Sequence, residues 1–272
     1  MDKKLEKLLN KFNIMQCVIV AFSGGVDSTF LLWSAIKALG KDNVLAVTGI
    51  SPSLMPRERN EAKQIAEQIG ARHVEINTDE MTNDSYRQNS PDRCMHCKDE
   101  LYSTLLKYAK EKNINSVVDG TNADETTEHR PGLKALQKHG ISSPLSEAGL
   151  TKDEIRQLAR RHGLPNWQKP SLACLASRIP YGSEVSEEKL RRIGLSEEYL
   201  LNLGFRQVRV RDHYPVARIE IEVGDMEKLF SNGNRADIEK TLKEYGYKFI
   251  TLDLAGFRSG SMNVLIEGDQ VE

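Results

Sequence analysis

The chain has 272 residues, of which 39% are hydrophobic and 28% charged, a globular composition long enough for one large α/β domain and a smaller partner. Its net charge of −1 excludes a global basic field, and no apolar stretch approaches the roughly 20 residues of a membrane span, so we expect neither a nucleic-acid nor a membrane partner. The four unevenly spaced cysteines do not form a secreted disulfide framework, and residues 1–13 carry no secretory signal, which predicts a cytoplasmic protein.

Apolar runs alternate with helical patterns through the first two-thirds of the chain. Strands are expected over 16–22, 43–50, 71–78 and 114–120, with helices over 28–40, 59–70 and 99–113. This alternation predicts an α/β fold whose parallel sheet has helices on both faces. Thr151 and Glu154 form a capping box at the start of a further helix.

The pattern changes at residues 165–186, which are rich in Pro, Ser and Gly and are typical of a loop or linker. Residues 206–223 then alternate with period two and break at "HYP", which predicts an antiparallel hairpin. A helix over 235–246 and a strand over 248–257 complete a small α+β domain. We therefore predict two domains, 1–182 and 183–272.

The segment "SGGVDS" directly after the first strand is the strongest chemical signal. Gly24 and Gly25 permit a tight turn before a helix that begins near Ser28, so backbone N–H groups face outward at the carboxyl edge of the sheet. Such an end binds an anionic phosphate, to which the two serine hydroxyls can add hydrogen bonds. Asp27 can hold Mg²⁺ against the phosphates. No Gly-Lys-Ser/Thr and no GxGxxG is present, and the remaining alternative is a plain glycine turn.

"SGGVDS" resembles the pyrophosphate loop of the ATP pyrophosphatases, or PP-loop enzymes. The resemblance implies that ATP is cleaved between its α- and β-phosphates and that a substrate oxygen is adenylated. It also implies that "VVDGTNADE" (117–125) is a second nucleotide-facing strand end, although a simple Asx-type turn is an open alternative. The ATP-binding residues implied in this way are Ala21, Ser23, Gly24, Gly25, Asp27, Ser28, Gly120, Thr121 and Asp124.

Four other segments narrow the resemblance. Residues 130–136, 177–182, 208–221 and 251–263 together resemble the LarE-type ATP-dependent sulfur transferases, and the match runs from about residue 15 to residue 263. That family builds the pyridinium thiocarboxylate nucleotide of the nickel-pincer cofactor of lactate racemase. The resemblance implies a pyridinium dicarboxylate mononucleotide as substrate, a sulfur donor of unknown identity, and a homo-oligomer, hexameric in that family.

Arginines in the second domain suit such a substrate. Arg209 and Arg211 leave the same face of one predicted strand, and Arg218 and Glu220 repeat the spacing on the returning strand. Guanidinium forks bind phosphate or carboxylate well, but a solvated, alternately charged face is an open alternative. The substrate-binding residues implied by the resemblance are Ser177, Arg178, Arg209, Arg211, Arg218, Glu220 and Arg258.

The cysteines raise a separate question. Cys94 and Cys97 lie immediately before a predicted helix, whose N-terminal end favours thiolates, and Cys174 lies in the 165–186 loop. Zinc would want a fourth ligand, for which His96 can be proposed, and a redox couple needs no third cysteine. Three thiolates without a fourth ligand suit a [4Fe–4S] cluster whose open iron holds the sulfide to be transferred. Cys17 opens a buried strand and is most simply a core residue.

The family comparison bears on this choice. Single-cysteine LarE-type proteins carry a sacrificial cysteine at the position of Ala173 and lack the pair, so the chain resembles the three-cysteine, iron–sulfur branch. Sacrifice of Cys174 itself is the alternative. The catalytic residues we predict are Asp27, Cys94, Cys97 and Cys174. A tRNA-thiolating enzyme is the nearest rival function, followed by an ammonia-using synthetase and by a non-catalytic nucleotide sensor.

Overall fold

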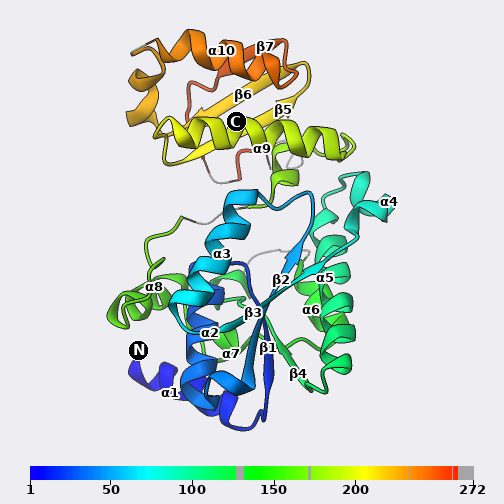
Figure 1. Cartoon of the computed structure of the whole chain (residues 1–272), viewed down its shortest axis with the longest axis vertical. Coiled ribbons are helices and arrows are strands. Elements are labelled where there is room, and N and C mark those ends of the chain that lie inside the picture. The colour runs from blue at the N-terminus through cyan, green and yellow to red at the C-terminus, as the bar shows by residue number, and fades with distance from the viewer. Residues whose placement is uncertain (127–131, 171–172, 232, 259, 263–272) are drawn as a thin grey trace, which may run out of the picture. The chain divides into compact units, whose positions relative to one another are not determined.

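The computed structural model describes residues 1–126, 132–170, 173–231, 233–258 and 260–262 (Figure 1). The chain divides into two compact units. The first unit comprises Met1–Glu80 and Asp92–Leu172, and the second comprises Met81–Pro91 and Ala173–Glu272. This division groups residues 173–182 and 81–91 with the second unit, whereas the predicted domain boundary is at residue 182. Among the described residues, the helices are all too short or too polar to cross a membrane.

The first unit is built on a four-stranded parallel sheet. Its strands are β1 (Val18–Ala21), β2 (Val44–Ile50), β3 (Arg72–Asn77) and β4 (Ser116–Val118), in the order β3-β2-β1-β4. All three strand pairs are parallel. The order changes direction between β1 and β4, and ligands of open α/β sheets bind at the carboxyl ends of strands at such a switch point.

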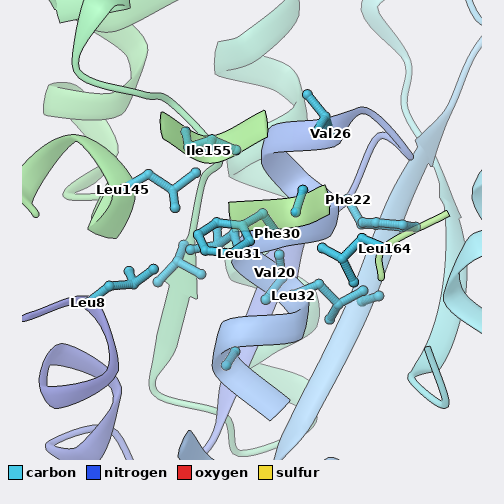
Figure 2. Close-up of a cluster of buried hydrophobic side chains, with 14 of the residues drawn as sticks. Leu8, Val20, Phe22, Val26, Phe30, Leu31, Leu32, Leu145, Ile155 and Leu164 are labelled. Atoms are coloured by element: carbon cyan, nitrogen blue, oxygen red, sulfur yellow. The ribbon is translucent and has the colours of Figure 1, made fainter. Parts of the chain in front are cut away.

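Helices cover both faces of this sheet (Figure 1). The first-unit helices are α1 (Asp2–Asn13), α2 (Val26–Leu39), α3 (Pro56–Gln68), α5 (Arg93–Glu111), α6 (Gly132–His139), α7 (Pro144–Glu147) and α8 (Lys152–Arg161), with the 3₁₀ turns η1 (Lys41–Asn43), η2 (Glu80–Thr82, which ends in the second unit) and η3 (Asp124–Thr126). Val18 and Val20 pack into a core with α1, α2, α3, α7 and α8, of which Figure 2 shows the centre. Ile19 faces the other core, with α5 and α6. The predicted α/β fold with helices on both faces is confirmed.

Local signals fix where two of these helices begin and end. Gly40 follows α2 with φ +80° and donates its N–H to the carbonyl of Ile36, which ends that helix. The predicted capping box of α8 is present, since Thr151 Oγ1 accepts the N–H of Glu154 and the Glu154 carboxylate accepts the N–H of Thr151. The start of α8 is therefore held independently of tertiary packing.

The second unit has a three-stranded sheet in the order β5-β6-β7. The predicted hairpin is formed by β5 (Val208–His213) and β6 (Val216–Ile221), and β7 (Phe249–Leu252) pairs parallel to β6. The helices are α4 (Asp84–Arg87), α9 (Glu187–Asn202) and α10 (Asn234–Glu244), with the 3₁₀ turns η4 (Leu175–Arg178) and η5 (Val223–Leu229). Side chains of α9 and α10 form one core with the sheet. The sequence patterns did not indicate α9.

Candidate functional site

The loop between β1 and α2 lies at the switch point of the first sheet. Gly24 has φ +68°, and a Cβ there would lie 2.8 Å from the Cα of Ala62 on α3. Gly25 is the N-cap of α2, which begins at Val26 rather than near Ser28. A side chain at position 24 would therefore be strained twice, by its backbone conformation and by α3. The first turn of α2, whose N–H groups have no partner within the helix, is the element for which the sequence predicts anion binding.

Hydroxyl groups hold this loop in shape. Ser28 Oγ accepts the N–H of Ser23 at 3.3 Å and donates to the carbonyl of Gly25 at 3.1 Å. Ser23 Oγ lies 3.1 Å from Ser28 Oγ and accepts the N–H of Gly25 at 3.3 Å. Ser23 is exposed and Ser28 buried, and Ala21 ends β1 directly before the loop. The two serines thus preorganise the turn before any ligand binds.

The second predicted motif meets the first. A Cβ on Gly120, just past β4, would lie 3.1 Å from the backbone N of Ser28 and 3.2 Å from its Cα. Thr121 donates its N–H to Asp119 Oδ1 at 2.8 Å. The segment after β4 therefore packs against the backbone of the first turn of α2, so the two predicted motifs lie side by side.

Asp27 lies in the first turn of α2 and has two unlike carboxylate oxygens. Oδ2 accepts hydrogen bonds from Lys152 Nζ and, at 3.4 Å, from Asn122 Nδ2. Oδ1 is buried and has no hydrogen-bond partner among the described residues. A free carboxylate oxygen fits Mg²⁺, which proteins hold by one or two carboxylates together with substrate phosphates and water.

Lys152 and Asn122 were missed by the sequence analysis. Asp124, predicted to face the nucleotide, accepts the backbone N–H of Lys152 at 2.7 Å with Oδ2. Asn122 Oδ1 accepts the N–H of Asp124 at 3.0 Å, which closes an Asx turn. The Asx-type turn considered as an alternative for residues 117–125 is thus present. The same segment also contacts Asp27 in the first turn of α2. Its effect is to place a lysine ammonium beside Asp27.

Asp119, a largely buried carboxylate, directly follows β4. Asp119 Oδ2 accepts the hydroxyl of Tyr102 at 2.8 Å and lies 3.7 Å from Lys98 Nζ. Burial opposes ionisation of Asp119, but Lys98 and the hydrogen bonds from Thr121 and Tyr102 outweigh it, so the pKa of Asp119 is lowered. Burial, followed by the negative charge of Asp119, raises the pKa of Tyr102. This network fixes the conformation of the β4 end.

Two further side chains hold the loop from the segment expected to be a linker. Asn166 Nδ2 donates to the carbonyl of Gly24 and to Thr29 Oγ1, both at 2.9 Å. Lys169 Nζ donates to the same carbonyl at 3.3 Å and pairs with Glu61 Oε2 at 2.9 Å. Burial opposes ionisation of Glu61, but Lys169 and Arg57 outweigh it and lower its pKa. Lone Asn and Lys residues in a Pro-rich segment carry no local signal of such contacts.

A cavity of about 300 Å³ lies in the first unit beside the end of β2 and the start of α3. Its lining is Ile50, Ser51, Leu54, Pro56, Arg59, Asn60, Lys63 and Glu75. Because Ala62, which packs against Gly24, is also on α3, this helix contacts both the cavity and the loop between β1 and α2.

The cysteine pair lies inside a helix, not before one as predicted. Because α5 begins at Arg93, Cys94 and Cys97 are its second and fifth residues, three residues apart and on one face. Cys94 is exposed and Cys97 half-buried, and Arg93 Nη2 lies 3.9 Å from Cys94 Sγ. Two soft thiol ligands on one face of a helix N-terminal turn fit two ligand positions of an iron–sulfur cluster.

Cys174 belongs to the second unit, where it is the N-cap residue of η4 and half-buried. Across the part of the chain that the structure describes, no three His, Cys, Asp or Glu side chains gather into a group that could hold a metal ion. The three-cysteine ligand set therefore stays a prediction.

Two arginines of the second-unit sheet, Arg209 and Arg211, are each 5% exposed, so the alternative of a solvated face is wrong for them, whereas the side chain of Arg218 is 31% exposed. Glu220 accepts Arg211 Nη2 at 2.8 Å and Arg218 Nη2 at 3.1 Å. Ser261 Oγ donates to Glu220 Oε1 at 2.8 Å. The structure thus brings four of the predicted substrate residues to one sheet.

The electrostatics of this arginine cluster (Arg209, Arg211, Arg218) suit an anion. The Nε atoms of Arg211 and Arg218 are buried and, among the described residues, have no hydrogen-bond partner. Arg209 stacks on Phe257, with its Cζ 5.2 Å from the ring centroid. Orphaned guanidinium donors at a buried site fit a phosphate or carboxylate. Arg258 is exposed.

Two other predicted substrate residues lie in η4 and are turned toward the protein. Arg178 is fully buried, with Nε and Nη2 on the carboxylate of Glu197. Ser177 Oγ donates to the carbonyl of Cys174 at 2.8 Å. Substrate contact by these two residues stays a prediction.

Comparison with known proteins places this geometry in a family. Residues 1–179 match the family model described as NAD synthase. The chain is 38% identical over 249 residues to the pyridinium-3,5-bisthiocarboxylic acid mononucleotide synthase of Lactiplantibacillus plantarum, covering 92% of this chain and 90% of that protein. It is 41% identical over 263 residues to an uncharacterized protein of Synechocystis sp., covering 97% and 98%. It is also 27% identical over 232 residues to the tRNA-specific 2-thiouridylase of Rickettsia felis, covering 70% and 61%.

The first match covers the unit that carries the glycine loop, and the match to the mononucleotide synthase extends over most of both units. The chain is therefore an ATP-dependent enzyme of the PP-loop superfamily, and it belongs to the NAD synthase family and to the family of the pyridinium-3,5-bisthiocarboxylic acid mononucleotide synthase.

Proposed function

We propose that the protein is an ATP-dependent sulfur transferase that converts a carboxylate of a pyridinium dicarboxylate mononucleotide to a thiocarboxylate, in the biosynthesis of a nickel-pincer nucleotide. The observation that carries this proposal is the 38% identity to a protein named for the bisthiocarboxylic acid product, over 92% of the chain. The PP-loop geometry supports the adenylation half of the reaction, and the buried arginines support an anionic substrate.

In the first step, the ATP phosphates lie on the N–H groups of Ser23–Ser28. Asp27 Oδ1, which is buried and has no hydrogen-bond partner among the described residues, would be the ligand for Mg²⁺, and the metal would supply charge stabilisation. A substrate carboxylate oxygen attacks the α-phosphorus and pyrophosphate leaves. During this attack Lys152 exchanges Asp27 for a phosphate oxygen and stabilises the charge that develops in the transition state.

The substrate phosphate and carboxylates bind the arginine cluster of the second unit. Arg211 and Arg218 offer the orphaned Nε donors, and Glu220 holds both guanidinium groups in register. Fork-shaped donors bind phosphate and carboxylate in a bidentate manner, so this cluster favours a doubly anionic ligand over a neutral one. Exposed Arg258 completes the predicted set.

In the second step, sulfur attacks the carbonyl of the acyl-adenylate and AMP leaves. Cys94, Cys97 and Cys174 are the residues that would hold a [4Fe–4S] cluster, which would supply the sulfide. The pairing of Cys94 and Cys97 on one helical turn supports this source. Sacrifice of the Cys174 side chain is the alternative, and it would leave dehydroalanine in the protein after one turnover.

One experiment tests the reaction and its sulfur source together. Protein purified without oxygen is assayed for iron, sulfide and visible absorption, then mixed with ATP, Mg²⁺ and the pyridinium dicarboxylate mononucleotide. We expect substrate-dependent AMP and pyrophosphate and a product 16 mass units heavier per oxygen replaced by sulfur, as the two atomic masses require. Absence of both AMP and thiocarboxylate would falsify the proposal. A Cys174 peptide lighter by the mass of hydrogen sulfide would instead identify the sacrificial route.

The similarity to a tRNA-specific 2-thiouridylase favours RNA thiolation as a second candidate. The net charge of −1 speaks against tight RNA binding, because such binding depends on neutralising phosphates with Lys and Arg. Filter binding with bulk tRNA at physiological salt separates the two. Retention of tRNA at micromolar protein would favour the second candidate.

A further inference from the structure

The turn that carries Cys174 is held by an unusual number of hydrogen bonds to one atom. The carbonyl of Cys174 accepts the N–H of Ser177 at 3.0 Å, Ser177 Oγ at 2.8 Å and Arg178 Nη1 at 2.8 Å. The same Nη1 also donates to the carbonyl of Ala173. The backbone on both sides of the Cys174 α-carbon is therefore anchored, while the side chain is half-buried.

The guanidinium that makes these contacts is itself fixed. Arg178 Nε and Nη2 donate to the two oxygens of Glu197, each at 2.9 Å, in a bidentate pair. The side chains of Arg178 and Glu197 are 0% and 2% exposed. A buried ion pair of this kind contributes little net stability, because desolvation of both charges offsets their attraction. An apolar replacement of the pair would lose the fixed geometry of these two hydrogen bonds.

The pair connects the Cys174 turn to the sheet that carries the arginine cluster. Glu197 Oε1 also accepts the N–H of Val210 on β5 at 2.9 Å. From the same strand, Arg211 Nη1 donates to the carbonyl of Ser177 at 3.1 Å. Two side chains thus link the turn to β5. One is Glu197, which acts through Arg178, and the other is Arg211, which also contacts Glu220.

We infer that the buried Arg178–Glu197 pair is a positioning device, which sets the backbone of Cys174 so that its sulfur is presented in one orientation relative to the arginine cluster. The inference rests on the proposed function in taking Cys174 as a sulfur-bearing residue. Arg178 and Glu197 do not touch the reacting atoms. They act through the carbonyls of Ala173 and Cys174, and misplacement of a reacting group by about 1 Å is enough to cost roughly 100-fold in rate.

The test measures the Cys174 thiol directly, in full-length protein freed of iron by chelation. Glu197→Gln keeps the shape of the side chain but removes the charge that orients Arg178. We expect iodoacetamide to alkylate Cys174 about tenfold faster in this variant, because the turn opens locally more often. Peptide mass spectrometry reports each cysteine separately, and Cys94, on the first unit, is the internal reference.

Asp212→Asn is the matched control. It breaks another buried arginine–carboxylate pair of the second unit, between Asp212 and Arg192 at 3.1 Å, which does not touch the Cys174 turn. We expect a comparable loss of thermal stability with an unchanged Cys174 to Cys94 alkylation ratio. Equal ratios in Glu197→Gln, Asp212→Asn and the parent protein would overturn the inference.

If Glu197→Gln fails to fold, Ser177→Ala provides a second test of the inference. It removes the hydroxyl bond to the Cys174 carbonyl and the acceptor that Ser177 Oγ offers to Arg178 Nη1 at 2.9 Å, and we expect about a threefold rise in the alkylation ratio. An unchanged ratio in Ser177→Ala would then overturn the inference. In active protein, Glu197→Gln should lower kcat about 100-fold and leave the KM for ATP unchanged. The alkylation result stands whether or not thiocarboxylate forms, so failure of the inference and failure of the proposed function are distinguishable.

Discussion

The proposed anion-binding sites of the two units are built from different groups. The first presents backbone N–H groups on a loop whose shape depends on glycines packed against neighbouring backbone, such as Gly24 on Ala62 and Gly120 on Ser28. The second places guanidinium groups in its sheet and balances them with a buried carboxylate, as Glu220 does for buried Arg211 and half-buried Arg218. Backbone dipoles carry no net charge to desolvate, whereas each buried arginine does. The first unit should therefore be sensitive to added volume and the second to removed charge.

The largest effect on stability is expected in the second unit. Glu220→Gln leaves Arg211 and Arg218 without the carboxylate they share, and breaking a buried pair costs about 3–5 kcal/mol. Urea unfolding should show this loss in the free energy of unfolding. Hydrogen exchange of the β5 and β6 amides should show that this sheet opens more often. The exposed pair of Lys243 and Glu239 is the control, and Glu239→Gln should leave the free energy of unfolding nearly unchanged. Similar losses for the two variants would break the contrast drawn between the units.

The largest effect on chemistry is expected in the first unit. Asp27→Asn removes the anionic oxygen proposed for Mg²⁺, and loss of a group that stabilises transition-state charge costs about 10²–10³ in rate. Substrate-dependent pyrophosphate release measures it. Asp42→Asn, on the exposed 3₁₀ turn η1, should change nothing. An unaffected rate in Asp27→Asn would remove Asp27 from the mechanism.

Gly24→Ala sharpens the claim about volume. The new Cβ would lie 2.8 Å from the Cα of Ala62 in a backbone with φ +68°, so the loop must deform, and we expect ATP to bind about 100-fold more weakly. Gly40→Ala is matched in backbone conformation, with φ +80°, but a Cβ there meets nothing within 4 Å. It should cost about 1 kcal/mol of stability and leave ATP binding intact. Calorimetric titration distinguishes the two.

Asp119→Asn tests the largely buried carboxylate that holds the end of β4. We expect a loss of about 1–3 kcal/mol in unfolding free energy at pH 7, since three donors lose an anionic acceptor. Because the pKa of Asp119 is lowered from 3.8 in the folded chain, its contribution is complete above that value and is lost as pH falls through the folded pKa. The difference between variant and parent should therefore shrink below about pH 4. A difference independent of pH would contradict the assignment.

The smallest effect is expected for Lys152→Met. The substitution keeps most of the side-chain length but removes the ammonium, and we expect ATP to bind about tenfold more weakly. Lys138→Met, in an exposed pair with Asp99, is the control. Equal ATP affinity in the two variants would show that Lys152 serves only to neutralise Asp27.

Local chemistry explains what could be predicted from the sequence. The strands, the hairpin, the capping box and the glycine loop all follow from residues near one another in the chain, and each is confirmed. By contrast, α9 was not predicted, because it follows a long loop segment and its charged sequence has Gly194 in the helix interior. Asn166 and Lys169 were missed because they reach Gly24 only through the folded chain.

The burial of charge in the second unit could not be predicted for the same reason. Alternating Arg and hydrophobic residues on a strand look alike whether the charged face meets solvent or partners. The contacts of Glu220 with Arg211 and Arg218 in the folded sheet distinguish these cases. The helical position of Cys94 and Cys97 was misjudged by a few residues, which is the usual uncertainty at a helix start.

The packing of Gly24 against α3 also restricts how this site can evolve. Replacing Ala62 by glycine would remove the Cβ that lies 2.9 Å from the added methyl group but would leave the Cα at 2.8 Å, so no exchange at position 62 alone compensates for alanine at position 24. Larger residues at position 62 would press on the loop from the other side. The helix and the loop thus form a pair of surfaces that must vary together, and random mutagenesis of both positions should recover only small residues among nucleotide-binding clones.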